Sequence, residues 1–198
     1  MRGKYIVFEG GENVGKTTQA ARLAEALPAA LVREPGGTLL GEEVRRLLLS
    51  PEINKQPETE VLLHAAQRSE LARTKTGPAL ETGLHVVSDR SWLSSAAYQG
   101  AQGIPFDRIL SVNQFALGEL MKPDLCILLD ADPVAAAERV PDKPKDYYES
   151  QGFEFHNRIR NNFLEIGAYM GAVIIDALQD VDVVTEQIRE EVTERLVI

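Results

Sequence analysis

The sequence predicts an α/β fold with three layers, in which helices cover both faces of a five-stranded parallel sheet. Short apolar runs, most of them rich in Val, Ile or Leu, alternate along the chain with longer stretches that have the period of a helix. Strands and helices that alternate in this way form parallel sheets. The first apolar run leads directly into a glycine-rich loop, which places an expected binding site at the start of the chain.

The expected strands are the apolar runs of strand length. In chain order they are YIVFE, AALVRE, LHVVSD, LCILLD and AVIID, at residues 5–9, 29–34, 84–89, 125–130 and 172–176. The helix-period stretches predict helices near 15–27, 38–49, 57–82, 105–120, 132–139, 153–170 and 181–196.

Charged residues end several of these strands, among them Glu9, Glu34, Asp89 and Asp130. In open parallel sheets, ligands bind where loops leave the carboxyl ends of the strands. Functional side chains are therefore expected at this edge. Glu9 alone is interpreted differently, as a strand-end charge that faces solvent.

Length and composition limit the number of domains, the class of protein and the kinds of partner that this chain can have. A chain of 198 residues is long enough for one domain, 1–198, with a single core. The 44% hydrophobic and 26% charged residues are typical of a globular protein. The net charge of −9 argues against a nucleic acid or an anionic membrane as partner, since both bind cationic surfaces. A small anionic ligand stays possible, because it needs only a local positive cluster.

The location is expected to be cytoplasmic. The apolar stretch near the N-terminus is too short for a signal peptide or a membrane span. The one cysteine, Cys126, cannot form an internal disulfide, which suits a reducing compartment.

Residues 10–18 match the phosphate-binding loop of P-loop NTPases, with a strand before the loop and a helix after it. The glycines let successive N–H groups point at phosphate oxygens, and the following helix adds its dipole. We expect Lys16 to reach the terminal phosphates of ATP and the Thr17 hydroxyl to ligate Mg²⁺. The further loop residues expected to bind the nucleotide are Gly10, Asn13, Val14, Gly15 and Thr18.

Several classes of protein share such a loop. A GTPase would carry an Asn/Thr-Lys-x-Asp sequence after a late strand, and none follows LCILLDADP. A motor ATPase would need a longer chain. Five strands, a short chain and arginines at strand ends favour a small kinase with a second pocket for its acceptor.

Three stretches resemble the thymidylate (dTMP) kinases, and the resemblance runs from the first expected strand to the last helix. They are FEGGENVGKTTQ from Phe8, REPGGTLLGEEVRRLLL from Arg33 and DRSWLSSAAYQG from Asp89, with weaker support from LLHAAQR and EFHNRIR. Many kinases share the first stretch, whereas the other two in this order are specific to the thymidylate branch. The resemblance implies transfer of the γ-phosphoryl group from ATP to dTMP with Mg²⁺, and a homodimer.

The resemblance also implies roles for the reacting groups. Glu12 would meet the 3′-hydroxyl of the acceptor sugar, and Asp89 would hold Mg²⁺ through water or orient the acceptor. Arg90 would bind the acceptor phosphate and, with Lys16, neutralise charge during transfer. Arg139 matches an arginine that covers the adenine face.

Further positions match the acceptor side of the family. Glu34 ends a strand, Pro35 follows it in a turn that often has a cis peptide bond, and Arg45 approaches the acceptor phosphate. The remaining expected contacts of the nucleoside are Ser95 and Gln99 at the thymine edge, Tyr98 at the sugar 2′ position, and His64 and Arg68 on one helix face.

His64 stands where the family usually has a phenylalanine that stacks on thymine, and Arg68 is expected to donate to the thymine O4. An imidazole can stack as well, although more weakly. Its charge is expected to be able to change near neutral pH.

The expected lid, about 141–152, departs furthest from the family. Bacterial members usually carry arginines there, often in a DRFE-like segment, and other members carry one in the phosphate loop. This chain has Tyr147 and Asn13 at those places. We hypothesise that Lys143 or Lys145 replaces the arginine, although an ammonium group cannot form its bidentate fork.

Alternatives stay open for the source of this charge and for the function. Arg158 or Arg160 could supply the charge, although a helix-face arginine is usually only solvated. The chain could also be another nucleotide kinase, or a catalytically weak nucleotide-binding regulatory protein. The presence of Lys16, Asp89 and Arg90 together counts against a protein that only binds nucleotide.

Overall fold

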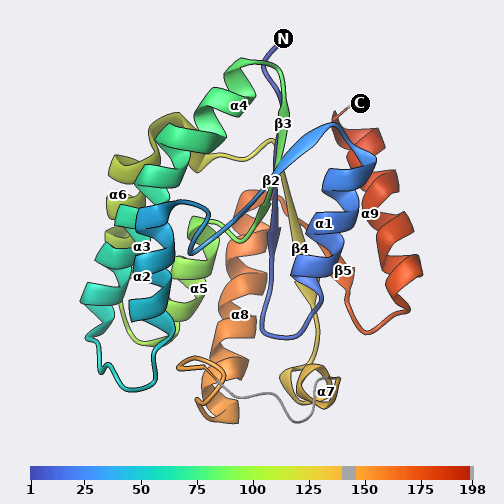
Figure 1. The fold of residues 1–198 in the computed structure, drawn as a ribbon. Helices are drawn as coiled ribbons and strands as arrows, with labels where there is room; N and C mark the ends of the chain where they lie inside the picture. Colours follow the sequence, from blue (N-terminus) through green and yellow to red (C-terminus); the bar gives the residue numbers. More distant parts are fainter. Residues whose placement is uncertain (140–145, 197–198) are drawn as a thin grey trace.

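The computed structural model describes residues 1–139 and 146–196, and it has the expected five-stranded parallel sheet (Figure 1). The strand order is β2-β3-β1-β4-β5, and every neighbouring pair is parallel. The strands are β1 Tyr5–Glu9, β2 Ala29–Arg33, β3 His85–Asp89, β4 Leu125–Asp130 and β5 Val173–Asp176. The prediction of the fold class is confirmed.

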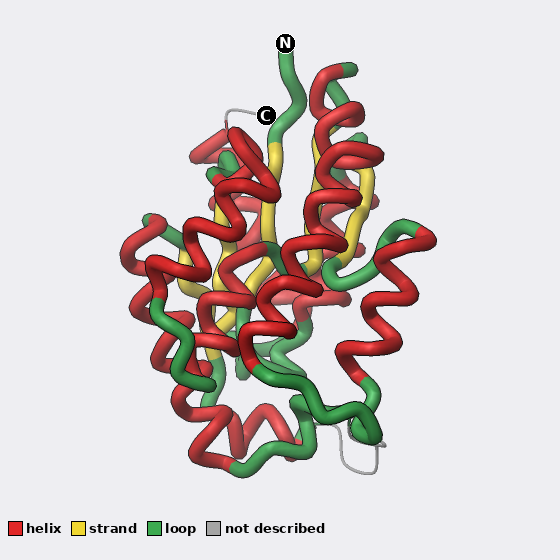
Figure 2. Tube along the Cα trace, turned by 90° about the vertical axis from the view of Figure 1, so that its left-hand side faces the viewer, coloured by secondary structure: helices red, strands yellow, loops and turns green. Residues whose placement is uncertain are grey.

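Helices cover both faces of the sheet (Figure 1; Figure 2 shows the side of α3 and α6). The helices N-terminal to β3 are α1 Lys16–Ala26, α2 Leu39–Leu49, α3 Pro57–Leu71 and α4 Gly77–Glu81. The later ones are α5 Trp92–Ala101, α6 Phe106–Leu117, α7 Pro133–Glu138, α8 Phe153–Met170 and α9 Val181–Leu196. A 3₁₀ turn, Gly118–Met121, follows α6.

Two helical expectations were wrong in part. The long helix expected over 57–82 is divided, because a π-helical turn at Ala72–Thr76 separates α3 from α4. Pro78 lacks the N–H that would continue an α-helical ladder through this turn. The helix α5 was not among the expected elements, although it carries the residues after Asp89 that the sequence marked as functional.

The position of β1 at the centre of the sheet explains why its apolar residues do not alternate with polar ones. All five of its residues are buried, because helices pack on both faces. Tyr5 and Val7 belong to the core under α3, α5, α6 and α8, whereas Ile6 and Phe8 belong to the core under α1 and α9.

The strand register brings two loops side by side at the carboxyl edge. Phe8 of β1 pairs with Asp89 of β3, and Arg33 of β2 pairs with the same Asp89. The glycine-rich loop after β1 therefore lies next to the Asp89–Arg90 turn. No helix in the described part of the chain is long and apolar enough to cross a membrane.

Candidate active site

The loop after β1 has the backbone of an anion-binding turn. Gly10, Asn13 and Gly15 have positive φ angles of 142°, 58° and 86°. A side chain at Gly10 would place its Cβ 2.3 Å from the carbonyl oxygen of Leu129, so glycine is required there. Gly15 caps the N-terminus of α1, which directs the positive end of the helix dipole at the loop.

Lys16 is buried at the base of this loop, and its ammonium group donates to the carbonyl oxygen of Gly11. Burial lowers the pKa of Lys16 to about 8, and the positive charge of Arg90 adds to this effect. An anion bound on the loop would favour the charged form of Lys16 and so raise this pKa again.

Thr17 and Asp89, the two expected ligands of Mg²⁺, lie together. The Thr17 hydroxyl donates to Oδ2 of Asp89 over 2.6 Å. Among the described residues, no group of three or more His, Cys, Asp or Glu side chains forms a metal site. A protein-only metal cage is therefore absent from the described part, and the oxygen pair is the remaining candidate.

Arg90 connects the loop to α5. Its guanidinium donates to Oε1 of Glu12 at 2.9 Å, to the Tyr98 hydroxyl at 3.2 Å, to Ser94 Oγ at 3.2 Å and to the carbonyl oxygen of Gly10 at 3.1 Å. The Tyr98 hydroxyl donates to the same carboxylate of Glu12. Burial opposes ionisation of Glu12, but the charges of Arg90 and Lys16 outweigh it and lower its pKa to about 2.

Glu9 does not face solvent, and that interpretation was wrong. Its side chain is fully buried, because β1 is the central strand and the turn after β3 closes over its end. The carboxylate accepts hydrogen bonds from the backbone N–H and hydroxyl of Ser91, both at 2.7 Å, and from the Ser94 hydroxyl at 2.6 Å. Burial raises its pKa, and these hydrogen bonds partly offset the increase.

Glu34 and Arg68 form a buried ion pair, with 2.5 Å between Oε2 and Nε. Arg68 also donates to Asn113 Oδ1 at 2.5 Å, to Ser95 Oγ at 3.3 Å and to the carbonyl oxygen of Ser91 at 3.0 Å. Burial raises the pKa of Glu34, although the charge of Arg68 opposes this. Sequence reasoning missed Asn113, since one buried polar residue on a predicted helix carries no distinguishing pattern.

A cavity of about 100 Å³ lies between the loop, α2, α3 and α5. Of the expected acceptor contacts, Glu12, Pro35, Arg45, His64, Arg90, Tyr98 and Gln99 line it. Glu34, Ser95 and Arg68 belong to the buried network beside it and are not among its lining residues. The peptide bond before Pro35 is cis, as expected, and Arg45 donates to the Pro35 carbonyl oxygen at 3.0 Å.

His64 stays neutral, which corrects the expectation that its charge changes near neutral pH. Burial, with the positive charges of Arg68 and Arg90, lowers its pKa to about 3. Its Nε2 lies 3.5 Å from the hydroxyl of Tyr148, a cavity residue that sequence reasoning did not select. The signal for Tyr148 was its position in the expected lid, directly after Tyr147.

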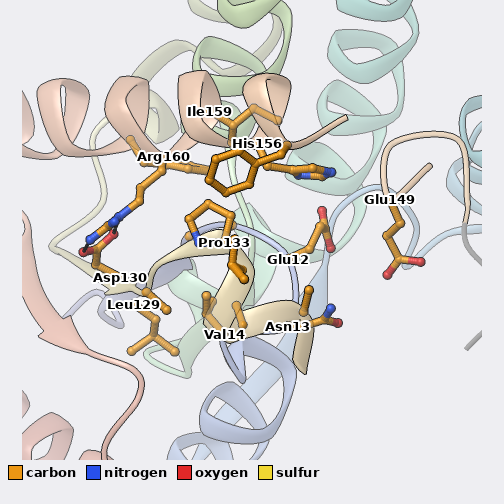
Figure 3. Close-up of a pocket in the computed structure, with 18 of the residues that line it drawn as sticks. Glu12, Asn13, Val14, Leu129, Asp130, Pro133, Glu149, His156, Ile159 and Arg160 are labelled. Carbon is orange, nitrogen blue, oxygen red and sulfur yellow. Dashed lines mark hydrogen bonds and ion pairs between the residues drawn. The ribbon is translucent and has the colours of Figure 1, made fainter. Parts of the chain in front are cut away.

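A second cavity of about 480 Å³ lies between the loop, the end of β4, α7 and α8 (Figure 3). The His156 imidazole points from α8 toward Glu12 in this view.

Arg160, one of the proposed substitutes for the missing arginine, is held by Asp130 through hydrogen bonds of 2.8 and 2.7 Å. The other, Arg158, has its guanidinium carbon 5.9 Å from the ring centroid of Phe155.

The structure describes only some of the remaining residues that were expected to bind ATP or to form the lid. Arg139 donates to the carbonyl oxygen of Ala177, after β5. Lys143 and Lys145 lie outside the described residues. Tyr147 is turned toward the segment after α2, where Lys55 Nζ lies 4.4 Å from its ring centroid and its own N–H donates to Leu49 O at 3.3 Å.

Comparison with known proteins identifies the family. The family model described as Thymidylate kinase matches residues 8–188. A relative named thymidylate kinase from Synechococcus sp. (strain RCC307) is 39% identical over 209 aligned residues, which cover 99% of this chain and 98% of the relative. One from Caldanaerobacter subterraneus is 38% identical over 204 residues with 99% and 98% coverage, and one from Desulforudis audaxviator is 44% identical over 176 residues with 85% and 79%. The chain therefore belongs to the thymidylate kinase family.

Proposed function

We propose that this chain, as one kinase domain over residues 1–198, transfers the γ-phosphoryl group of ATP to dTMP and releases dTDP and ADP. One observation carries the proposal. Glu12 belongs to the anion-binding loop and also lines the smaller cavity, where Arg90 holds it. A donor phosphate on the loop and an acceptor in the cavity would therefore meet at one place.

The donor would bind along residues 10–18, with its phosphates on the loop N–H groups and Lys16 beside the terminal ones. The loop backbone supports this placement, because Asn13 and Gly15 hold the left-handed conformations that turn successive N–H groups inward. Arg139 would lie against the adenine.

Mg²⁺ fits the pair formed by Thr17 and Asp89. Their oxygens lie 2.6 Å apart, and Mg²⁺ prefers oxygen ligands while keeping several waters, so two protein groups suffice. When bound, the ion would offset charge on the donor phosphates. Thr17 and Asp89 would hold it, directly or through water.

The acceptor would bind with its phosphate near Arg45 and Arg90, its sugar near Tyr98 and its base near His64 and Gln99. Ser95 and the Glu34–Arg68 pair would support the base side from behind the cavity, through the bonds that join them. Arg68, which the sequence predicts to donate to the thymine O4, has four hydrogen-bonded partners within the protein.

In the transfer step, a phosphate oxygen of dTMP attacks the γ-phosphorus, and the bond from that phosphorus to the ADP oxygen breaks. The phosphate monoester is largely a dianion at neutral pH, so its attacking oxygen needs no general base. Lys16 and Arg90 would neutralise the charge that moves between donor and acceptor. The protein therefore contributes mainly position and electrostatics.

We also propose a homodimer and a cytoplasmic location. The homodimer is supported by large exposed apolar side chains on α3 and α6, namely Leu62 and Phe115, and by the resemblance to the family. The location is supported by the single buried cysteine, Cys126, which cannot form an internal disulfide.

The test is ADP release with ATP and Mg²⁺ across a panel of nucleoside monophosphates, beside a Lys16→Ala control. We expect release that depends on dTMP and falls by about 10³-fold in the control, because the ammonium group that neutralises the phosphates is lost. ADP release that depended instead on another monophosphate would contradict the acceptor assignment. Nucleotide binding without any release would favour the regulatory alternative.

A further inference from the structure

Four buried polar side chains meet at the inner end of the smaller cavity. Gln99 of α5 and Glu60 of α3 are fully buried, and their Nε2 and Oε2 atoms lie 3.1 Å apart. The Tyr148 hydroxyl lies 2.9 Å from the same Glu60 oxygen and 3.3 Å from Gln99 Nε2. His64 completes the group, which we call the Gln99 cluster: Glu60, His64, Gln99 and Tyr148.

In the Gln99 cluster, the amide nitrogen of Gln99 and the hydroxyl of Tyr148 both donate to the same oxygen of Glu60. A carboxylate only accepts hydrogen bonds, so the amide nitrogen of Gln99 must face Glu60. The Tyr148 hydroxyl also donates to Glu60, which leaves its own oxygen to accept from Gln99. The amide oxygen of Gln99 is thereby turned away from both, and it has no hydrogen-bond partner although it is buried.

The same arrangement assigns the tautomer of His64. The hydrogen of the Tyr148 hydroxyl is used by Glu60, so the weak contact of 3.5 Å with His64 needs a hydrogen on Nε2. The other nitrogen, Nδ1, is then a bare acceptor, and it too is buried without a partner. Gln99 and His64 are among the residues that line the cavity, and Oε1 of Glu60 is a third buried acceptor without a partner. All three cluster atoms that lack a partner are therefore covered acceptors, and none is a donor.

Leaving buried acceptors without a partner costs free energy, and a ligand with an N–H group at this end would recover it. Thymine and uracil carry a hydrogen on N3. Cytosine has a lone pair at N3, which would face the lone pairs of the Gln99 oxygen. The arrangement therefore distinguishes thymine and uracil from cytosine by the direction of one hydrogen bond at N3.

We propose that Glu60 and Tyr148 are positioning residues, which fix the amide of Gln99 with its oxygen toward the base and so select 2,4-dioxopyrimidine monophosphates over cytidine monophosphates. The inference rests on the proposed placement of the acceptor base beside Gln99. Neither Glu60 nor Tyr148 needs to touch the base, because each acts through the amide.

The experiment measures kcat/KM for dTMP, dUMP and dCMP with Glu60→Gln. A glutamine at 60 can donate as well as accept, so the Gln99 amide is free to turn its nitrogen toward the base. We expect the dTMP-to-dCMP ratio to fall by roughly tenfold or more, because the penalty against cytosine disappears. The dTMP-to-dUMP ratio should stay within about twofold, since both bases present the same N3–H.

Glu58→Gln is the matched control, because it makes the same chemical change at an exposed position of α3 and should leave all three ratios unchanged. Thermal unfolding of each variant checks that it folds. Tyr148→Phe removes only a hydroxyl, and it should lower the dTMP-to-dCMP ratio by a smaller factor in the same direction.

Gln99→Leu separates the two ways in which the idea can fail. If Gln99→Leu lowers the dTMP-to-dCMP ratio but Glu60→Gln and Tyr148→Phe do not, the positioning roles are wrong and the base placement stands. If Gln99→Leu also leaves the ratio unchanged, the base does not lie beside Gln99, and the proposed placement falls with the inference.

Discussion

At the scale of single residues, Glu9 holds the turn that presents Arg90. Arg90 has a φ of 76°, a left-handed conformation that a residue with a side chain rarely adopts. Two residues that follow Arg90 in the chain, Ser91 and Ser94, donate hydrogen bonds to the Glu9 carboxylate. The N–H of Arg90 itself donates to the carbonyl oxygen of Phe8 at 2.9 Å. A strained backbone persists only where its surroundings fix it, so Glu9 is a candidate positioning residue for Arg90.

Glu9→Gln should therefore weaken binding of the acceptor phosphate. An amide cannot accept from both serines as the carboxylate does, so we expect dTMP to bind roughly tenfold more weakly. Thymidine has no phosphate for Arg90, and its affinity should change by less than about twofold. Calorimetric titration of both ligands measures the difference, and equal losses for dTMP and thymidine would indicate a merely structural role.

His64 makes the stability of the protein depend on pH. Its pKa is about 3 in the folded protein, whereas an unfolded histidine titrates near 6.5. Between these values the unfolded chain binds a proton that the folded protein does not, so stability falls as pH is lowered from about 6.5 toward 3. The contribution has a slope of at most about 1.4 kcal/mol per pH unit.

His64→Phe should remove this contribution. We expect the melting temperature of the variant to fall less than that of the parent between about pH 7 and about pH 5. Differential scanning calorimetry at matched ionic strength measures the two slopes. Parallel slopes would mean that His64 is protonated in the folded protein or exposed to solvent.

At the scale of elements, α5 joins the two halves of the site. Ser91 caps its N-terminus by accepting from the N–H of Leu93, and the same hydroxyl donates to Glu9. One turn further, Ser94 and Tyr98 contact Arg90, and Gln99 faces the cavity. A single helix therefore sets the distance between the phosphate end and the base end of the acceptor pocket.

In the expected lid, the open question is which residue supplies positive charge in place of the missing arginine. Its described part is fixed by Tyr147 beside Lys55, and Arg160 is held by Asp130. Lys143 and Lys145 remain our candidates for the positive charge that the lid of this chain would supply. An arginine finger contributes about 10³ to 10⁵ in rate, and an ammonium group without the bidentate geometry should contribute less.

Replacing Lys143 and Lys145 together by alanine should lower kcat by about tenfold or more, because charge on the transferring group is less well neutralised. The KM for dTMP should change little. Steady-state kinetics measure both, with Lys75→Ala/Lys122→Ala as the control that loses the same two charges at exposed positions. Unchanged turnover in the lid variant would exclude the lysine hypothesis.

At the scale of the whole molecule, two helices that pack against each other each expose a large apolar side chain. Phe115 on α6 is 89% exposed and Leu62 on α3 is 61% exposed, and these two helices pack against each other. Contiguous exposed apolar patches mark protein interaction sites, and we propose that Phe115 and Leu62 belong to one. A second copy of the chain is the partner that the family resemblance implies.

Phe115→Asp should convert the proposed homodimer to a monomer, because a charge would be buried without a partner in the interface. Size-exclusion chromatography with light scattering measures the mass, which should fall by about half. Val183→Asp, on α9 at the other face of the sheet, adds the same charge at an exposed position and should leave the mass unchanged. A monomeric parent protein would contradict the proposal outright.

Local patterns were sufficient for the sheet, for most helices and for the loop. Apolar runs and helical periods are local properties, and the phosphate-binding sequence forms from neighbouring residues. The division of the helix over 57–82 was missed, because a π-helical turn has no period that distinguishes it from the helix around it. The helix α5 was missed because its residues are buried almost throughout, which removes the polar face that marks a surface helix.

The amino-acid order alone was enough to specify the fold class, the family resemblance and the side chains to examine, since these depend on spacing along the chain. The burial of Glu9, the neutrality of His64 and the free oxygen of Gln99 depended on folding. Each results from groups that come together over long sequence separations: Glu9 with Ser91 and Ser94, His64 with Arg90, and Gln99 with Glu60. Solvation and hydrogen-bond direction are properties of such assembled neighbours, and for that reason no local pattern contains them.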